Sequence, residues 1–255
     1  MANDSLTMAT PIVSIITITY NAVQTVERTI LSVEEQDYPA IQYIVIDGGS
    51  TDGTMQVVGR HSKRVNLIVS EPDDGIYYAM NKGLDIATGE YVWFVNAGDE
   101  FNGPDAVSRA MANADGADIC YGDTVITAMD GSIIGGRRLT PPETLTRDSF
   151  RDGMLVCHQA FIARRTLCPH YDTQYRFSAD YDWCLRIIEK SRKTVNTHET
   201  IVRFLDGGVT KSHIVDGLRE RFRIMRQHYG LAPTVLRHIP IGIRFLWFWA
   251  TKGRF

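Results

Sequence analysis

The first hundred residues alternate between short β-branched runs and stretches with apolar side chains at helical spacing. Residues 12–19 are β-branched apart from Ser14, a composition that is typical of a strand buried on both faces of a sheet. In residues 76–87 the apolar side chains recur every three or four positions, which predicts an amphipathic helix. We expect strands at 12–19, 41–46, 65–70 and 91–95, with helices between them. Repeated units of this length predict a mostly parallel central sheet flanked by helices, a Rossmann-like α/β fold.

The pattern is less regular after residue 100. The expected elements are helices at 104–114, 182–191 and 212–229 and strands at 119–121, 124–128, 132–137 and 194–205. The Asp130-Gly131 pair predicts a hairpin turn between the second and third of these strands. Residues 138–157 show no periodicity, and we expect them to form a mobile loop.

Composition and charge narrow the class of protein. The 255 residues are 44% hydrophobic and 22% charged, which suits one large core and excludes collagen-like, coiled-coil and disordered chains. The net charge of −3 argues against a nucleic-acid binder. Residues 211–255 hold nine Lys or Arg and two acids, whereas the preceding residues hold 18 and 28. We therefore expect one domain over 11–210 and a basic helical extension over 211–255, which either contacts a negatively charged partner or is solvated.

The sequence also bears on the cellular compartment. The four cysteines lack metal-site spacing, and residues 1–11 lack the features of a signal peptide, so we expect reduced thiols and a cytoplasmic protein. No apolar run approaches the ~20 residues that span a bilayer. Residues 239–249 are apolar and aromatic, and Lys252 and Arg254 follow them. This segment can lie on the inner membrane surface as a peripheral anchor, pack against the body, or pair two subunits.

Acidic and amide residues follow three of the predicted strands. They are Asp47, Asp73, Asp74, Asn96 and Asp99. In open α/β sheets, ligands bind beyond the carboxyl ends of the strands. The turns carry neither the P-loop nor the dinucleotide glycine fingerprint. An acidic edge of this kind predicts a divalent cation that neutralises a bound phosphate.

Six short motifs resemble those of family 2 glycosyltransferases with the GT-A fold. They are S-I-I-T-I-T-Y-N (Ser14–Asn21), D-G-G-S-T-D-G-T (Asp47–Thr54), N-K-G (Asn81–Gly83), A-T-G-E-Y (Ala87–Tyr91), N-A-G-D (Asn96–Asp99) and A-D-Y-D-W (Ala179–Trp183). The resemblance covers roughly residues 11–210. It implies an inverting enzyme that transfers a sugar from a nucleotide-sugar, with UDP favoured, to a hydroxyl of a glycan or lipid-linked glycan in cell-surface polysaccharide synthesis.

The resemblance also implies roles for individual residues. Asp180 matches the catalytic base, which takes the proton of the acceptor hydroxyl. Asp182 stays an alternative, because the glutamate that the family commonly has before the base is absent. Asp99 matches the last acid of the metal-binding D-x-D motif and would hold Mg²⁺ or Mn²⁺, although the motif has lost its other acids. The residues implied in donor binding are Thr19, Tyr20, Asn21, Asp47, Asp74, Asn81, Lys82, Asn96 and Asp99.

Several of these residues have a structural alternative. Asp47 can simply form its turn, and Asp99 can cap a loop. Asn81 and Lys82 can belong to a solvated helix face. Asp182, two residues from Asp180, would face away from it on a helix and interact with the helix dipole.

Two histidines are weaker candidates for the site. His158 lies near the expected acceptor side, and His213 follows a glycine-rich segment as a late metal ligand. A single histidine is more often structural than catalytic.

A second functional class is a non-catalytic nucleotide-sugar-binding protein, which the depleted D-x-D motif favours and the retained Asp99 and Asp180 oppose.

Overall fold

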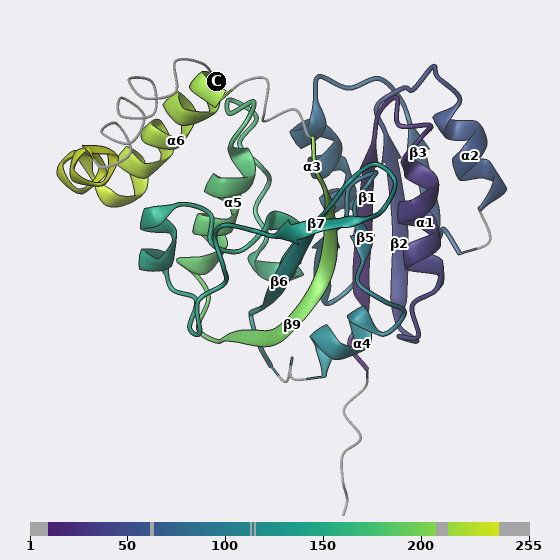
Figure 1. The fold of residues 1–255 in the computed structure, drawn as a ribbon, viewed down its shortest axis with the longest axis horizontal. Helices are drawn as coiled ribbons and strands as arrows, with labels where there is room; N and C mark the ends of the chain where they lie inside the picture. The colour runs from purple at the N-terminus through teal and green to yellow at the C-terminus, as the bar shows by residue number, and fades with distance from the viewer. Residues whose placement is uncertain (1–9, 62–63, 113, 115, 208–213, 240–255) are drawn as a thin grey trace, which may run out of the picture.

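A nine-stranded sheet forms the centre of the molecule, with helices packed around it (Figure 1). The computed structural model describes residues 10–239 apart from 62–63, 113, 115 and 208–213. The strand order is β3-β2-β1-β4-β8-β6-β9-β5, and β7 pairs with β6. Two buried clusters fill the space on either side, and consecutive residues such as Ile15 and Ile16 belong to different clusters. This alternation is what a strand buried on both faces requires.

The first half of the sheet is parallel, as the sequence predicts. It consists of β1 (Val13–Thr19), β2 (Ile41–Asp47), β3 (Leu67–Ser70) and β4 (Tyr91–Phe94), connected by α1 (Val26–Glu34), α2 (Thr54–Arg60) and α3 (Ile76–Ile86). All seven residues of β1 are buried, which explains why every residue of β1 except Ser14 is β-branched. The apolar sides of α1 and α2 pack on one face of the sheet and that of α3 on the other.

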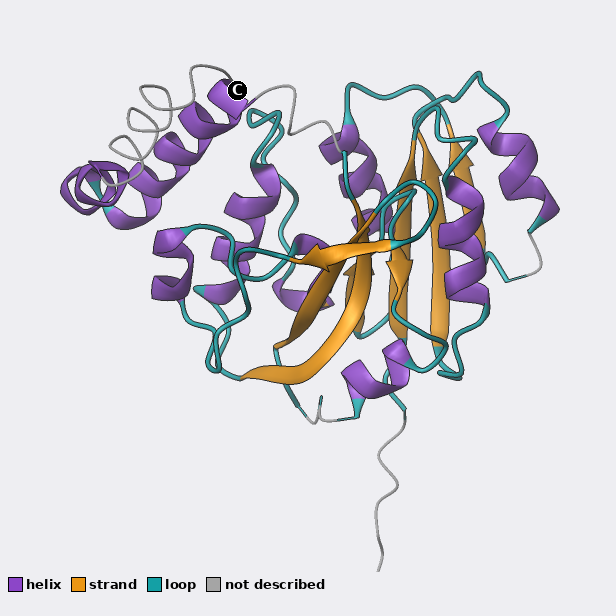
Figure 2. Ribbon diagram, in the orientation of Figure 1, coloured by secondary structure: helices purple, strands orange, loops and turns teal. Residues whose placement is uncertain are grey.

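Beyond β4 the sheet is mixed (Figure 2). The further strands are β5 (Glu100–Phe101), β6 (Ile119–Thr127), β7 (Ile133–Gly136), β8 (Phe161–Arg164) and β9 (Thr194–Leu205). β8 is antiparallel to both β4 and β6, and β9 returns parallel to β6. The predicted β6–β7 hairpin is present. The two strands predicted at 119–121 and 124–128 are one, because β6 continues through an irregularity around Asp123 instead of ending there.

The prediction of a mobile loop over residues 138–157 is wrong. Leu145, Phe150, Met154 and Val156 are buried in the core, and a 3₁₀ segment, η1 (Arg147–Asp152), lies within this stretch. These side chains were not predicted to be buried because they follow no helical or strand spacing: this stretch, which the structure describes throughout, contains no α-helix or strand. The Phe150 ring stacks on Tyr181, with centroids 5.8 Å apart.

The remaining helices are α4 (Ala106–Met111), α5 (Ala179–Ile188) and α6 (Ile214–Tyr229), and residues 231–239 are also helical. α5 begins earlier than predicted and contains Asp180 in its first turn. Within the described ranges no helix is both long and apolar enough to cross a bilayer, and the four cysteines are free thiols. His213 and the apolar segment beyond residue 239, with Lys252 and Arg254, lie outside the described residues.

α6 is held on α5 by a histidine between two carboxylates. His228 contacts Asp182 Oδ1 through Nε2 and Glu189 Oε1 through Nδ1, each at 3.0 Å. Burial lowers the pKa of His228, but the hydrogen bonds to Asp182 and Glu189 outweigh this and raise it above the ordinary value of 6.5. The charged, doubly paired imidazole therefore stabilises the docking of α6.

We expect this stabilisation to disappear as the pH rises above neutral. A raised folded-state pKa contributes its full stability below the unfolded value and loses it as the pH passes through the folded value. Thermal unfolding between about pH 6 and about pH 9 should show a falling midpoint. The variant His228→Gln, which cannot titrate, should flatten that fall, and an unchanged slope in the variant would contradict the assignment.

Candidate functional site

The ends of β1 and β2 form one edge of the site. The Gly48 N–H donates to the Thr19 carbonyl at 3.0 Å, which joins the two turns. Asp47 is fully buried, and its oxygens accept hydrogen bonds from both polar groups of Ser50, from the Gly49 N–H and from the Ser70 hydroxyl. Asp47 thus holds its own turn together, as the structural alternative for this residue expects. Its carboxylate accepts hydrogen bonds from protein groups.

Asn21 fastens this edge from the β1 side. Its backbone is in the left-handed region, with φ at 46°, where asparagine is tolerated better than most residues. Its N–H donates to the Ser50 hydroxyl at 2.7 Å, and its side-chain oxygen accepts the Thr51 N–H at 2.9 Å. The neighbouring Tyr20 is 65% exposed, whereas Thr19 is buried. The Tyr20 ring is therefore available to stack on a ligand, whereas Thr19 is buried and the side-chain oxygen of Asn21 is engaged with Thr51.

Asp73 is one of the acidic residues noted at the strand ends, but it is not among those that the resemblance implies in donor binding. One carboxylate oxygen accepts the Gly75 N–H at 3.0 Å, and the other, Oδ2, is buried with no hydrogen-bond partner among the described residues. A Cβ on Gly48 would stand 3.0 Å from Asp73 Oδ2 and 3.3 Å from the Tyr20 ring. The carboxylate and the ring therefore lie close together at Gly48. Asp74, the residue implied by the resemblance, is exposed.

α3 connects this edge to the rest of the site. Asn81 uses both ends of its amide on the backbone of Tyr171, at 2.7 and 3.1 Å. Lys82 forms an ion pair with Glu71 at 2.9 Å and so braces the segment that leads to Asp73. Both predicted donor-binding residues are thus engaged with protein, and they fix the position of α3.

Asp180 faces the first turn of α3. The buried Tyr77 hydroxyl donates to Asp180 Oδ1 at 3.2 Å, across two helices distant in sequence. Asp180 is half-buried, whereas Asp182 is 4% exposed and pairs with Arg186 at 2.6 Å as well as with His228. The expectation that the two acids face different surroundings on one helix agrees with this geometry. Asp180 is the one that keeps an accessible surface.

His158 belongs to the aromatic support under α5. It is 4% exposed, contacts the Tyr171 hydroxyl at 2.7 Å, and its ring lies 5.4 to 5.9 Å from those of Phe94, Tyr171 and Trp183. Burial lowers the pKa of His158 to about 4, so the imidazole is neutral at pH 7. This arrangement fits a structural histidine.

Asp99 and Asn96 lie on one turn after β4. Asp99 is 4% exposed, and its Oδ1 accepts the Leu205 N–H at 2.9 Å. Burial raises the pKa of Asp99 to about 7, against hydrogen bonds from Leu205 and Gln159 that lower it. Asn96 Oδ1 is buried without a partner in the described part of the chain, where no cluster of three or more His, Cys, Asp or Glu could hold a metal. Carboxylate and amide oxygens are ligand types that Mg²⁺ and Mn²⁺ accept.

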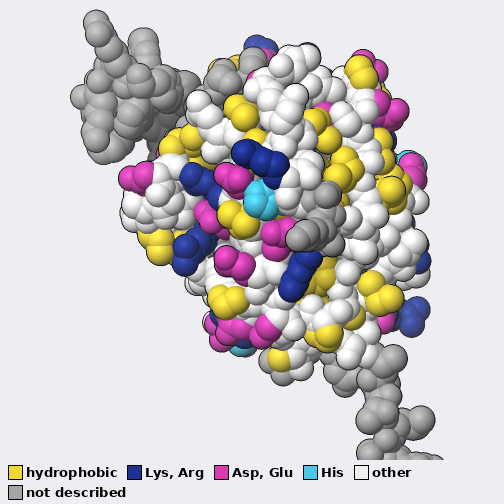
Figure 3. All heavy atoms as spheres, turned by 90° about the vertical axis from the view of Figure 1, so that its right-hand side faces the viewer, with side chains coloured by type: hydrophobic (Ala, Val, Ile, Leu, Met, Phe, Trp, Pro, Cys, Tyr) yellow, Lys and Arg dark blue, Asp and Glu magenta, His cyan; other side chains and the backbone are white. Residues whose placement is uncertain are grey.

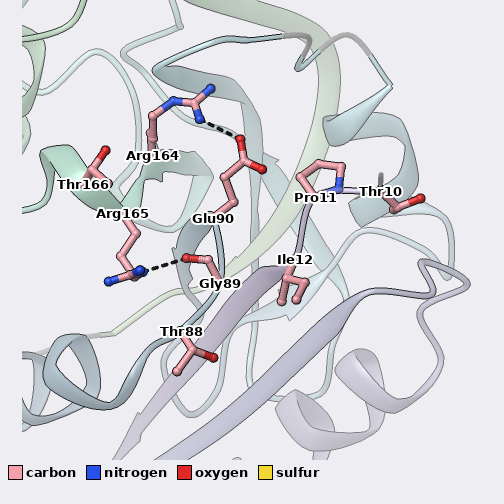
Figure 4. A pocket seen from close by; sticks show the side chains of 9 residues that line it. All are labelled: Thr10, Pro11, Ile12, Thr88, Gly89, Glu90, Arg164, Arg165 and Thr166. Carbon is pink, nitrogen blue, oxygen red and sulfur yellow. Dashed lines mark hydrogen bonds and ion pairs between the residues drawn. The ribbon is translucent and has the colours of Figure 1, made fainter. Parts of the chain in front are cut away.

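A separate cavity of about 380 Å³ lies at the other end of β1 (Figure 4). It is bounded by residues that precede β1 and β4 and by the pair Arg164 and Arg165. Arg164 pairs with Glu90 at 2.6 Å, and Arg165 donates to the Gly89 carbonyl at 2.7 Å. This cavity is therefore distinct from the edge that carries Tyr20 and Asp73.

The fold and its polar edge define an α/β protein of the GT-A glycosyltransferase type. Residues 14–170 match the family described as glycosyl transferase family 2, and the chain belongs to that family. A glycosyltransferase of Mycobacterium tuberculosis is 34% identical over 185 residues, which is 69% of this chain and 68% of its own. TuaG of Bacillus subtilis, named for teichuronic acid biosynthesis, is 26% identical over 200 residues, 76% of this chain and 79% of its own.

Solved structures share the fold. S. aureus TarS residues 1–349, in complex with UDP, gives a TM-score of 0.69 at 20% identity, covering 90% of this chain and 72% of that one. The mannosyltransferase PcManGT of Pyrobaculum calidifontis, in complex with GDP-Man and Mn²⁺, gives 0.59 at 18% identity, covering 91% and 75%. These matches establish the GT-A-type architecture of mixed sheet and flanking helices.

Proposed function

We propose that this glycosyltransferase moves a sugar from a UDP-sugar, with inversion, to a hydroxyl of a glycan or lipid-linked glycan in cell-surface polysaccharide synthesis. The observation that carries the proposal is the hydrogen bond from Tyr77 to Asp180, because it brings a half-exposed carboxylate to the helix that begins at the donor edge. The UDP complex of TarS and the name of TuaG support the donor nucleotide and the type of product.

The donor edge has groups suited to a uracil ring. The exposed Tyr20 ring can stack on the base, and Asp73 Oδ2, which lacks a partner in the described residues, can accept the base N–H. A neutral base that donates an N–H to this half-buried carboxylate gains a charge-assisted hydrogen bond. The diphosphate would then extend toward the turn of Asn96 and Asp99.

Asp180 is suited to act as the base. Its Oδ1 accepts the Tyr77 hydroxyl and the Tyr181 N–H, which leaves Oδ2 to take the acceptor proton. As that proton moves, the acceptor oxygen bonds to the anomeric carbon, and the bond to the diphosphate oxygen breaks on the opposite side. Asp99 and Asn96 would hold a divalent ion, which supplies positive charge to the leaving diphosphate when bound.

Asp73→Asn should weaken UDP binding by about tenfold, because a charge-assisted hydrogen bond of about 1.5–3 kcal/mol becomes a neutral contact. Calorimetry with UDP, with and without Mn²⁺, measures this directly. Asp74→Asn is the matched control and should bind UDP like the parent. If Asp74→Asn lost UDP affinity and Asp73→Asn did not, the uracil ring would not bind at Asp73.

The same calorimetry tests the proposed class of protein. If UDP does not bind, GDP and dTDP are the next nucleotides to titrate, and failure of all three would contradict a nucleotide-sugar donor. If UDP binds but no UDP-sugar is hydrolysed or transferred by the parent protein, the chain is a non-catalytic binding protein on the same fold.

A further inference from the structure

α6 and the helical residues 231–239 form a two-helix unit, here called the hairpin, in which the chain turns at Gly230, whose φ is 85°. The Phe222 ring of α6 lies edge-on against the His238 ring, with centroids 5.0 Å apart. The Thr234 hydroxyl donates to the Gly230 carbonyl at 2.7 Å and is buried. The contact between the two rings therefore joins the second helix to α6.

The inner side of α6 is attached to the body. Ile224 and Met225 join the core, and the Glu220 carboxylate accepts the N–H groups of Arg176 and Phe177, each at 2.8 Å. With His228 bound to Asp182, these contacts orient the outer side of α6 away from the sheet. The position of that outer side is thus fixed.

The outer side of α6 is basic. Arg219, Phe222, Arg223 and Arg226 line a groove of about 320 Å³. Arg219 pairs with Asp216, but Arg223 and Arg226 have no ion-pair partner in the part of the chain that the structure describes. By contrast, the opposite end of the molecule, over α2, shows charges of both signs interspersed (Figure 3).

The second helix of the hairpin exposes a row of large apolar side chains. Leu231, Val235 and Ile239 recur every four residues on one helix face, and Leu236 lies beside them. Their exposed fractions are 58%, 42% and 50%, and that of Leu236 is 67%. A contiguous apolar row of this kind marks an interaction surface.

We propose that this basic and apolar hairpin, formed by the three arginines and the four apolar residues, docks on an anionic phospholipid bilayer. A short helical unit that exposes both cationic and apolar side chains matches the chemistry of a lipid interface. Charge complementarity supports the orientation, because residues 211–255 are net positive and residues 1–210 net negative. An anionic bilayer would attract the hairpin and repel the body.

The position of the hairpin relates it to the proposed reaction. α6 packs beside α5, which carries Asp180 in its first turn (Figure 1). Docking through α6 would place a membrane next to the helix of the base, where a lipid-linked acceptor would arrive. This last step rests on the proposed function, whereas bilayer binding itself does not.

Vesicle flotation of the full chain tests the proposal. We expect the chain to float with vesicles of phosphatidylcholine containing about a third phosphatidylglycerol, and not with phosphatidylcholine alone. Binding should fall in about 1 M NaCl. Arg223→Glu with Arg226→Glu should reduce binding by roughly tenfold or more, and so should Leu231→Ser with Leu236→Ser.

Matched controls lie at the other end of the molecule. Arg60→Glu on α2, whose side chain is 65% exposed, and Leu67→Ser on β3 should leave vesicle binding unchanged. UDP calorimetry and circular dichroism on each variant separate loss of folding and failure of the donor site from loss of docking. Vesicle binding that survives both hairpin variants, or a dimer that the hairpin variants dissociate without any vesicle binding, would overturn the proposal.

Discussion

Asp180→Asn should lower the rate of sugar transfer by a factor on the order of 10²–10⁴ while UDP affinity stays at the parent level. The amide keeps the shape of the side chain and can still accept the Tyr77 hydroxyl, but it cannot take a proton from the acceptor. The measurement is turnover of a UDP-sugar with the acceptor present, beside calorimetry with UDP. A parent-like rate in this variant would remove Asp180 from the reaction.

Two neighbouring variants keep this result interpretable. Tyr77→Phe deletes the hydroxyl that holds Asp180, and we expect only a several-fold loss of kcat with UDP affinity unchanged. Asp182→Asn removes the partner of Arg186 and His228 and should act mainly on thermal stability. If Asp182→Asn instead abolished turnover in a folded protein, the base would be Asp182.

Trp183→Ala should lower the free energy of unfolding by about 3–5 kcal/mol, a large part of the ~5–15 kcal/mol that holds a typical domain together. Trp183 is fully buried on α5, its ring stacks on Tyr171 at 4.8 Å between centroids, and its indole N–H donates to the Pro169 carbonyl at 2.8 Å. Truncation would leave a cavity between α5 and the ring of Tyr171. Denaturant unfolding measures the loss.

An exposed aromatic residue supplies the control for this variant. Tyr20→Ala removes a ring that is 65% exposed and should change the free energy of unfolding by no more than about 0.5 kcal/mol. It should, however, weaken UDP binding if the ring stacks on the base. Equal destabilisation by Trp183→Ala and Tyr20→Ala would show that the aromatic cluster under α5 is not a critical part of the core.

The parallel half of the sheet was predictable because its elements follow local rules. The buried run of β1, the helical spacing of α3 and the hairpin at Asp130-Gly131 are each encoded within a few residues. β8 is only four residues long, and its partners β4 and β6 are far from it in sequence. No local pattern therefore predicts it. The buried side chains of residues 138–157 depend on similar long-range contacts.

The candidate site was predictable in composition but not in geometry. The motifs pointed to Asp180 and to the acidic turns. The sequence does not show which of Asp73 and Asp74 faces the site, and the position of Gly48 beside Asp73 does. Nothing local to Tyr77 indicates that it reaches α5. The saturated carboxylate of Asp47 depends on Ser70, which belongs to a different strand.

The strand order also has a consequence for how the chain folds during synthesis. β1 to β4 pair with one another within the first part of the chain, and β8 pairs with the open side of β4 once residues 161–164 have emerged. β6, however, pairs along its length with β9, so Ile119 cannot pair with Thr194 until that much of the chain has been synthesised. Non-local pairings of this kind form slowly. The two-residue β5 depends on the same late strand. On the ribosome, the parallel half of the sheet, β1 to β4, should therefore assemble first. One edge of β6 should stay unpaired until β9 has emerged.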